Sequence, residues 1–221
     1  MAKGTRSLSY IRKKVTLTHE TISAAYHEAG HAIYTLLCGM KVPFVHVYQN
    51  KKTKRIEGVC QYEIPDFTIV KDPILFYTLV NVEIGIKYAG LTAEKYHFKT
   101  LSGSDKFPMF LRDGSSDDTL SAAALIRQYN LAKPGKDRYT YKKKMISFIL
   151  KQLKEYWQDV VLISHALFGH KKIFFDKIKK ILTKKSQNKK FWKDKFKSII
   201  ELDQSYETLD EENMKIIMSI A

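Results

Sequence analysis

The sequence predicts a protein of the α+β class that is mainly helical and carries one small β-sheet or hairpin. Long apolar stretches begin with helix-capping residues, which favours helices. One region near residue 50 instead has strand-like apolar runs on either side of a charged turn. The 221 residues are 44% hydrophobic and 12% aromatic, which is enough for a buried core and unlike a largely disordered chain.

The first helix is predicted over residues 19–38. Thr18 suits the N-cap position, and Gly39 suits the position just after the helix. Gly30 lies in the middle, where glycine costs about 1 kcal/mol relative to alanine, so we expect another element to pack closely there. Residues 1–17, which are basic and polar, are expected to form a loose arm or a short docking strand before this helix.

A β-hairpin is predicted over residues 41–62. Apolar, strand-like runs contain Val45 and Val47 on one side and Val59 and Cys60 on the other. The charged segment 50–55 between them is the expected turn.

The rest of the chain is predicted to be helical. Asp72 followed by Pro73 is typical of a helix start, and the apolar helix that follows should run to about Phe98 through the core. A flexible region is expected over 100–114, and Ser115 or Ser116 should cap the next helix. That helix should end near residue 130, before a linker at 133–136. Helices are then predicted over 140–166 and 174–182. A lysine-rich helical stretch and a short amphipathic segment at 214–220 should follow.

The formal net charge of +15 is concentrated in one region. Residues 171–200 contain twelve lysines and two aspartates, whereas residues 201–221 contain six acidic residues and one lysine. We therefore predict three parts: the arm 1–17, a domain 18–170, and a lysine-rich helical extension 171–221 with an acidic tail. Lysine without a recognised binding motif is more typical of a solvated surface, so binding to nucleic acid or an anionic membrane ranks last among the functions considered.

The cysteine content and the apolar runs indicate the cellular compartment to expect for the protein. The chain has two cysteines, which gives no disulfide framework and fits a reducing environment. Residues 1–14 lack the apolar core of a signal peptide, and the most apolar run, 73–91, is interrupted by polar and charged residues. We expect a cytoplasmic protein without a transmembrane segment.

His27, Glu28 and His31 form an HExxH pattern at the centre of the first helix. Side chains four apart on a helix share one face, with β-carbons about 5–6 Å apart, so both imidazoles can reach one metal ion. Glu28 would then lie beside the metal, where a carboxylate can take a proton from water. The alternative is a chance pattern with solvated histidines, but the flanking helix is strongly apolar, which favours a buried pair that a metal ion satisfies.

A catalytic zinc site needs a third protein ligand. Asp117 and Asp118 are candidates because they open a helix after a glycine-rich segment. Acidic residues also favour a first helical turn without any metal, because they complement the helix dipole. The residues alone leave these alternatives open.

Three segments, in this order, resemble the FtsH-type, membrane-anchored ATP-dependent zinc metalloproteases. Residues 25–32 (AYHEAGHA) resemble the zinc-binding helix of that family, residues 89–94 (AGLTAE) its Gly-Gly-Arg-x-Ala-Glu helix, and residues 114–118 (GSSDD) its Gly-Ala-Ser-Asn-Asp segment. The resemblance covers about residues 16–170. The second segment departs from the family pattern, with Ala89 for a glycine and Leu91 for the arginine.

The resemblance implies a zincin-like, mostly helical metallopeptidase domain that binds Zn²⁺. It maps the metal ligands to His27, His31 and Asp118 and the general base to Glu28. The sequence contains no phosphate-binding GxxxxGK[ST] loop, so we expect a peptidase domain without its own ATPase. A separate ATPase or further copies of the chain are the partners this implies.

The predicted function is that of a zinc metalloendopeptidase acting on peptides or unfolded proteins. An extended substrate would lie along the strand that contains Gly58, Val59 and Cys60, although the same strand can equally be an ordinary hairpin covering the core. The alternative function is an inactive or partner-dependent metal-binding interaction module.

Overall fold

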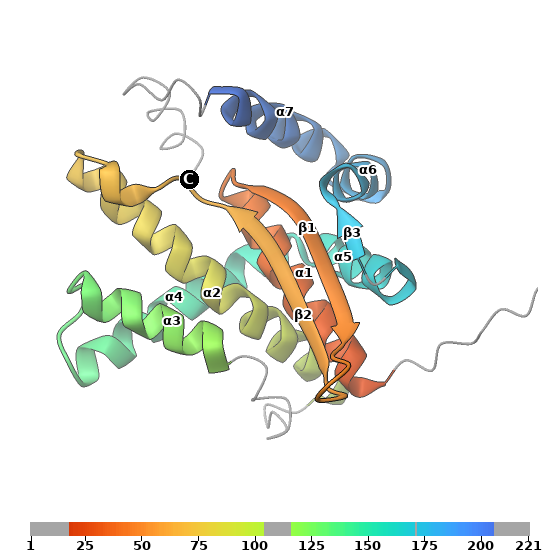
Figure 1. Cartoon of the computed structure of the whole chain (residues 1–221), viewed down its shortest axis with the longest axis horizontal. Helices are drawn as coiled ribbons and strands as arrows, with labels where there is room; N and C mark the ends of the chain where they lie inside the picture. Colours follow the sequence, from red (N-terminus) through yellow and green to blue (C-terminus); the bar gives the residue numbers. More distant parts are fainter. Residues whose placement is uncertain (1–17, 104–115, 171, 206–221) are drawn as a thin grey trace, which may run out of the picture.

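The computed structural model describes residues 18–103, 116–170 and 172–205 (Figure 1). Over these residues the protein is mainly helical and has one small antiparallel sheet, as the sequence predicts. The elements, in chain order, are α1 (His19–Leu37), β1 (Lys41–Gln49), β2 (Ile56–Glu63), the 3₁₀ turn η1 (Phe67–Ile69), α2 (Pro73–Ser102), α3 (Ser116–Gln128), α4 (Lys136–Glu155), α5 (Trp157–His170), β3 (Lys172–Phe174), α6 (Phe175–Lys185) and α7 (Lys189–Ser205).

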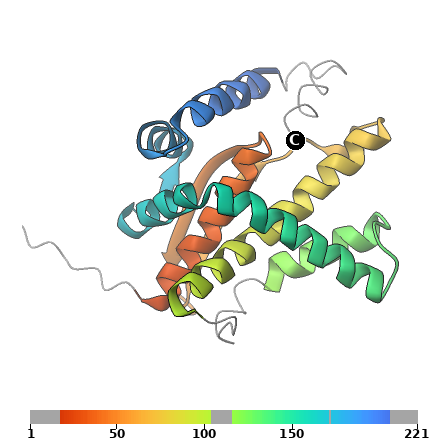
Figure 2. The ribbon, with the colours of Figure 1, turned by 180° about the vertical axis from the view of Figure 1, so that it is seen from behind.

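Helix α1 lies at the centre of a layered arrangement. The sheet covers one side of α1 and α2 runs beside it (Figure 1), while α4 and α5 cross behind both (Figure 2). Because other elements surround it, almost the whole of α1 from residue 25 to residue 36 is buried. A motif on this helix is therefore held in the interior of the protein.

Local signals fix both ends of α1. Thr18 caps the start, its hydroxyl accepting a hydrogen bond from the backbone N–H of Thr21 at 3.2 Å. Gly39 follows the end with a φ of +81°, which favours glycine. A β-carbon on Gly30 would lie 2.5 Å from that of Ala93, which confirms the close packing expected there and shows that α2 is the partner.

The hairpin is confirmed, and a third strand joins it. The strand order is β2-β1-β3, with β1 antiparallel to both neighbours. Val45, for example, pairs with Cys60 on one side and with Ile173 on the other. The sequence analysis did not anticipate β3, because a three-residue strand is defined by its distant partner rather than by a pattern of its own.

Helix α2 is longer than predicted. The Asp72 side chain caps it by accepting from the backbone N–H groups of Ile74 and Leu75, and it ends at Gly103, whose φ is +64°. The helix therefore extends past Phe98, into the region expected to be flexible; the remainder of that region, 104–115, lies outside the described residues. By length and composition α2 could cross a membrane, but 61% of its most apolar window is buried within the fold.

One predicted helix is in fact two. A continuous helix is predicted over 140–166, whereas α4 starts earlier, at Lys136, and ends at Glu155. Tyr156 leaves helical geometry with φ −105° and ψ 24°, and α5 begins at the next residue. The break lets Trp157 pack on Tyr26 of α1, with ring centroids 5.7 Å apart. The sequence around Tyr156 contains no proline or glycine to indicate this break.

The described part of the C-terminal extension packs on the rest of the protein. β3 belongs to the shared sheet, and Ile178, Trp192 and Phe196 belong to the same hydrophobic core as α1 and α2. The domain boundary at residue 170 stays a prediction. The expected arm 1–17 and the amphipathic segment 214–220 lie outside the described residues.

Candidate metal centre

The HExxH side chains lie in the protein interior. His27, Glu28 and His31 are only 6%, 7% and 5% exposed. Their burial follows from the position of α1 between the sheet and α2. Buried polar groups of this kind need partners, and each histidine has two.

The structure brings Asp118, at the start of α3, to the two histidines. Its Oδ2 atom lies 3.2 Å from His27 Nε2 and 3.1 Å from His31 Nε2. One ligand atom from each of the three residues lies within 4.8 Å of the other two. Asp117, the other candidate, is not part of this group.

The other ring nitrogen of each histidine is already engaged. His31 Nδ1 donates to the carbonyl oxygen of Ile86 at 2.7 Å, and His27 Nδ1 lies 3.1 Å from a carboxylate oxygen of Glu94. The hydroxyl of Ser23 in turn donates to the other oxygen of Glu94. With a proton on each Nδ1, both Nε2 lone pairs point toward Asp118 Oδ2.

With that proton placement three electron-pair donors face one point, and a positive charge there, carried by a proton or by a metal ion, relieves their repulsion. Burial lowers the pKa of His27, but hydrogen bonds to Asp118 and Glu94 outweigh burial and raise that pKa to about 10. Burial raises the pKa of Asp118, yet its hydrogen bonds to both imidazoles hold that pKa well below the ordinary range. Both pKa directions fit a site that favours a positive charge, which either a proton on His27 or a bound cation supplies. The set of two imidazoles and one carboxylate could hold a divalent metal ion such as Zn²⁺.

Gly90 on α2 leaves room at the point of convergence. A β-carbon at this position would lie 2.4 Å from His31 Nε2 and 2.5 Å from His27 Nε2. Any larger residue would push against both nitrogens that face Asp118. Gly90 belongs to residues 89–94, the second segment of the resemblance, and this crowding explains why a glycine occupies the position.

The second oxygen of Asp118 faces a lysine. Lys87 Nζ lies 3.9 Å from Asp118 Oδ1 and 3.8 Å from a carboxylate oxygen of Glu83. Tyr62 donates a hydrogen bond of 3.1 Å to the same Glu83 oxygen. Lys87 is thereby held where it restrains Asp118 and leaves Oδ2 directed at the histidines.

Strand β2 lies directly against Glu28. A β-carbon on Gly58 would lie 2.4 Å from Glu28 Oε1, so only glycine lets the strand approach this closely. Alternation along a strand places Cys60 on the same face as Gly58 and Val59 on the other. Because β2 is an outer strand of the sheet, one of its edges has no strand partner in residues 18–103, 116–170 and 172–205.

Burial raises the pKa of Glu28, against a smaller opposing influence of the two histidines. A raised pKa is the direction that suits a carboxylate acting as a general base near neutral pH. Burial likewise raises the pKa of the Cys60 thiol, which disfavours the reactive thiolate form at neutral pH.

Sequence reasoning missed most of the supporting groups. It placed Glu94 only within the second segment that resembles the metalloproteases, and it gave no role to Lys87 or to the Ile86 carbonyl. A helical count from Glu94 could have indicated Gly90 and Lys87, since spacings of four and seven place these residues on one face of α2. The backbone carbonyl of Ile86 leaves no trace in a sequence.

No protein-family model matches the chain, and a search of curated proteins finds no match either.

Proposed function

We propose that the protein is a zinc-dependent metallopeptidase that hydrolyses peptide bonds in peptides or unfolded proteins. The observation that carries the proposal is the convergence of His27, His31 and Asp118 on one point with Glu28 beside the histidines on the same helix. Two imidazoles and one carboxylate are a ligand set that catalytic zinc sites use.

In this proposal the Nε2 atoms of His27 and His31 and the Oδ2 atom of Asp118 hold the metal. When bound there, zinc acts as a Lewis acid that polarises a peptide carbonyl and lowers the pKa of water toward about 7. The Nδ1 contacts to Glu94 and Ile86 fix the ring orientation that this requires.

Glu28 is proposed as the general base and then the general acid. Its carboxylate accepts a proton from the water whose oxygen attacks the carbonyl carbon. It next delivers that proton to the amide nitrogen as the C–N bond breaks and the amine leaves. The burial of Glu28 limits the access of bulk water, which would otherwise exchange the proton.

The free edge of β2 is the proposed place for the substrate. An extended peptide can pair its backbone with an exposed sheet edge, so recognition depends little on side chains. Gly58 brings this strand against Glu28, which connects the binding edge to the proposed base. Substrates must be extended to bind in this way, which favours short peptides and unfolded chains over folded proteins.

The resemblance of three segments to the FtsH-type metalloproteases supports the same proposal. Under it the fold is zincin-like, and a separate ATPase or further copies of the chain would supply unfolded substrate. These partners are part of the proposal and rest on the resemblance alone.

The test is the Glu28→Gln variant, assayed with a fluorescently labelled unfolded protein after loading with zinc. We expect cleavage to fall by about 10²-fold or more, because the amide cannot accept the proton, while the zinc content stays that of the wild type. Glu20→Gln is the matched control, since Glu20 is exposed in the first turn of the same helix. Cleavage by Glu28→Gln at the wild-type rate would contradict the mechanism. A zinc-loaded wild type that cleaves no unfolded protein or peptide would favour the interaction module instead.

A further inference from the structure

A second candidate site lies away from the metal centre. A cavity of about 710 Å³ opens between the C-terminal end of α1, the first half of α2, α4 and α7. Its volume falls within the range of roughly 300–1,000 Å³ that is usual for small-molecule sites. None of the metal-facing residues lines it. Its walls are mainly apolar and aromatic and include Leu37, Val82, Met145, Phe148, Tyr156 and Phe191.

Lys195 of α7 also lines this cavity and is only 8% exposed. Within the described part of the chain its ammonium group has no ion pair or hydrogen bond. Burial lowers its pKa to about 8, although the neighbouring Cys38 raises it somewhat. Leaving an ammonium group buried and unpaired is costly, so this position is suited to an anionic partner.

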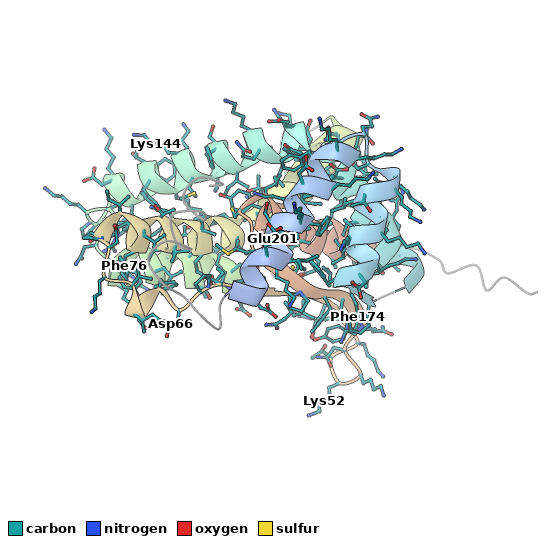
Figure 3. The ribbon with its side chains drawn as sticks, turned by 90° about the horizontal axis from the view of Figure 1, so that it is seen from above. Lys52, Asp66, Phe76, Lys144, Phe174 and Glu201 are labelled. Atoms are coloured by element: carbon teal, nitrogen blue, oxygen red, sulfur yellow. The ribbon has the colours of Figure 1, made fainter. Side chains whose placement is uncertain are left out.

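Two other polar groups of the cavity pair with each other. Tyr141 of α4 donates a hydrogen bond to the side-chain oxygen of Asn81 on α2. Large apolar side chains nevertheless remain in contact with solvent, with Phe148 at 52% and Phe191 at 36% exposed. Figure 3 shows α4, with Lys144, and the start of α2, with Phe76, on the same side of α7. The cavity therefore combines one unpaired buried cation with apolar walls that reach the surface.

We infer that this cavity binds a long-chain carboxylate, with the carboxylate paired to Lys195 and the apolar chain lying against the aromatic walls. A single lysine is a point charge that can pair with one carboxylate, and the apolar walls match an apolar chain attached to it. The inference does not depend on the proposed peptidase function, because the two sites share no residue.

The experiment compares two probes of equal chain length, dodecanoate and dodecanol, by calorimetric titration of the full chain below the concentration at which they aggregate. The wild type should bind dodecanoate at one saturable site and more tightly than dodecanol. Lys195→Met keeps the apolar stem and removes the charge. We expect it to weaken dodecanoate binding roughly ten- to hundredfold and to leave dodecanol binding almost unchanged.

Lys193→Met is the matched control, since Lys193 is exposed two residues earlier on the same helix. It should bind dodecanoate like the wild type; an equal loss in both variants would mean attraction to the basic surface and would overturn the inference. The absence of saturable dodecanoate binding by the wild type, or unchanged affinity in Lys195→Met, would also overturn it.

A second variant covers the case in which Lys195→Met does not fold. Thr78 lines the cavity and is only half-buried, so Thr78→Trp should fill the cavity without unfolding the protein. It is expected to abolish binding of both probes. Normal binding of dodecanoate by Thr78→Trp would place the ligand elsewhere and overturn the inference.

Discussion

At the scale of single residues, each of the three metal-facing groups is restrained by a second contact. Glu94 holds His27, the carbonyl of Ile86 holds His31, and Lys87 faces the outer oxygen of Asp118. Restraints of this kind fix ring and carboxylate orientation before any ion binds, which reduces the cost of ordering the ligands.

Lys87 offers a direct test of this restraint. We predict that Lys87→Met weakens zinc binding by roughly tenfold, because Asp118 loses the charge that orients it. The measurement is the dissociation constant for zinc, obtained by competition with a chromophoric chelator.

Lys87→Arg keeps the positive charge and should stay closer to the wild type. A Lys87→Met protein with an unchanged dissociation constant would show that Asp118 needs no such partner.

The local part of the site could be predicted from the sequence, and the distant part could not. Helical periodicity alone places His27 and His31 on one face of α1, with Glu28 next in the chain. Asp118 follows His31 by 87 positions, and nothing in the residues decided between it and Asp117 without the family resemblance. Contacts over such distances depend on how α2 and α3 pack, which no local pattern encodes.

At the scale of elements, β2 and α1 act as a pair. The strand passes so near the helix that there is no room for a side chain at position 58 beside the Glu28 carboxylate. The strand edge proposed to hold the substrate and the proposed base are thereby kept in a fixed relation.

We expect Gly58→Ala to change the position of Glu28 relative to β2 without reducing the amount of bound zinc. Its β-carbon would displace either the strand or Glu28, and we predict a cleavage rate that is lower by roughly ten- to hundredfold. Zinc content should be unchanged, because the three atoms nearest to the added β-carbon all belong to Glu28 rather than to a metal-facing residue. The readouts are the initial rate on an unfolded protein and the bound zinc of the same sample.

Lys52→Ala, at the exposed tip of the hairpin (Figure 3), is the control and should behave as the wild type. A Gly58→Ala enzyme with the full rate would mean that β2 does not position Glu28.

Elements with strong local signals were the ones predicted well. Thr18 and Asp72 start their helices as expected, since an N-cap acts within three residues. The break at Tyr156 and the strand β3 were missed, because both depend on distant partners: Trp157 packs on α1, and β3 pairs with β1.

At the scale of the whole molecule, a buried polar contact ties α7 to α5. Asp159 is fully buried, and one of its oxygens accepts hydrogen bonds from Trp192 Nε1 at 2.8 Å and from Asn188 Nδ2 at 3.4 Å. This contact joins the predicted extension to the predicted 18–170 domain. It suggests that both parts unfold together.

Trp192→Phe tests that suggestion. The change removes a donor from a buried carboxylate, and we predict a loss of about 1–3 kcal/mol in the free energy of unfolding. Trp157 is then the single remaining tryptophan, and it reports on α5. Urea unfolding followed by its fluorescence and by circular dichroism should give one coincident transition, shifted to lower urea.

Two separate transitions, of which Trp192→Phe shifts only one, would instead show that the extension is an independent domain. A shift of both probes together would support a single cooperative unit.

The central claim is that His27, His31 and Asp118 form one metal site, and its most direct test is the zinc-to-protein ratio of the purified protein after loading and dialysis. We predict a ratio near one for the wild type and for Asp117→Ala, whose exposed carboxylate lies beside the site but outside the ligand group. Asp118→Ala should retain little zinc, because two histidines alone bind it weakly. A wild type that retains no zinc, or an Asp118→Ala protein that retains as much as the wild type, would contradict the account.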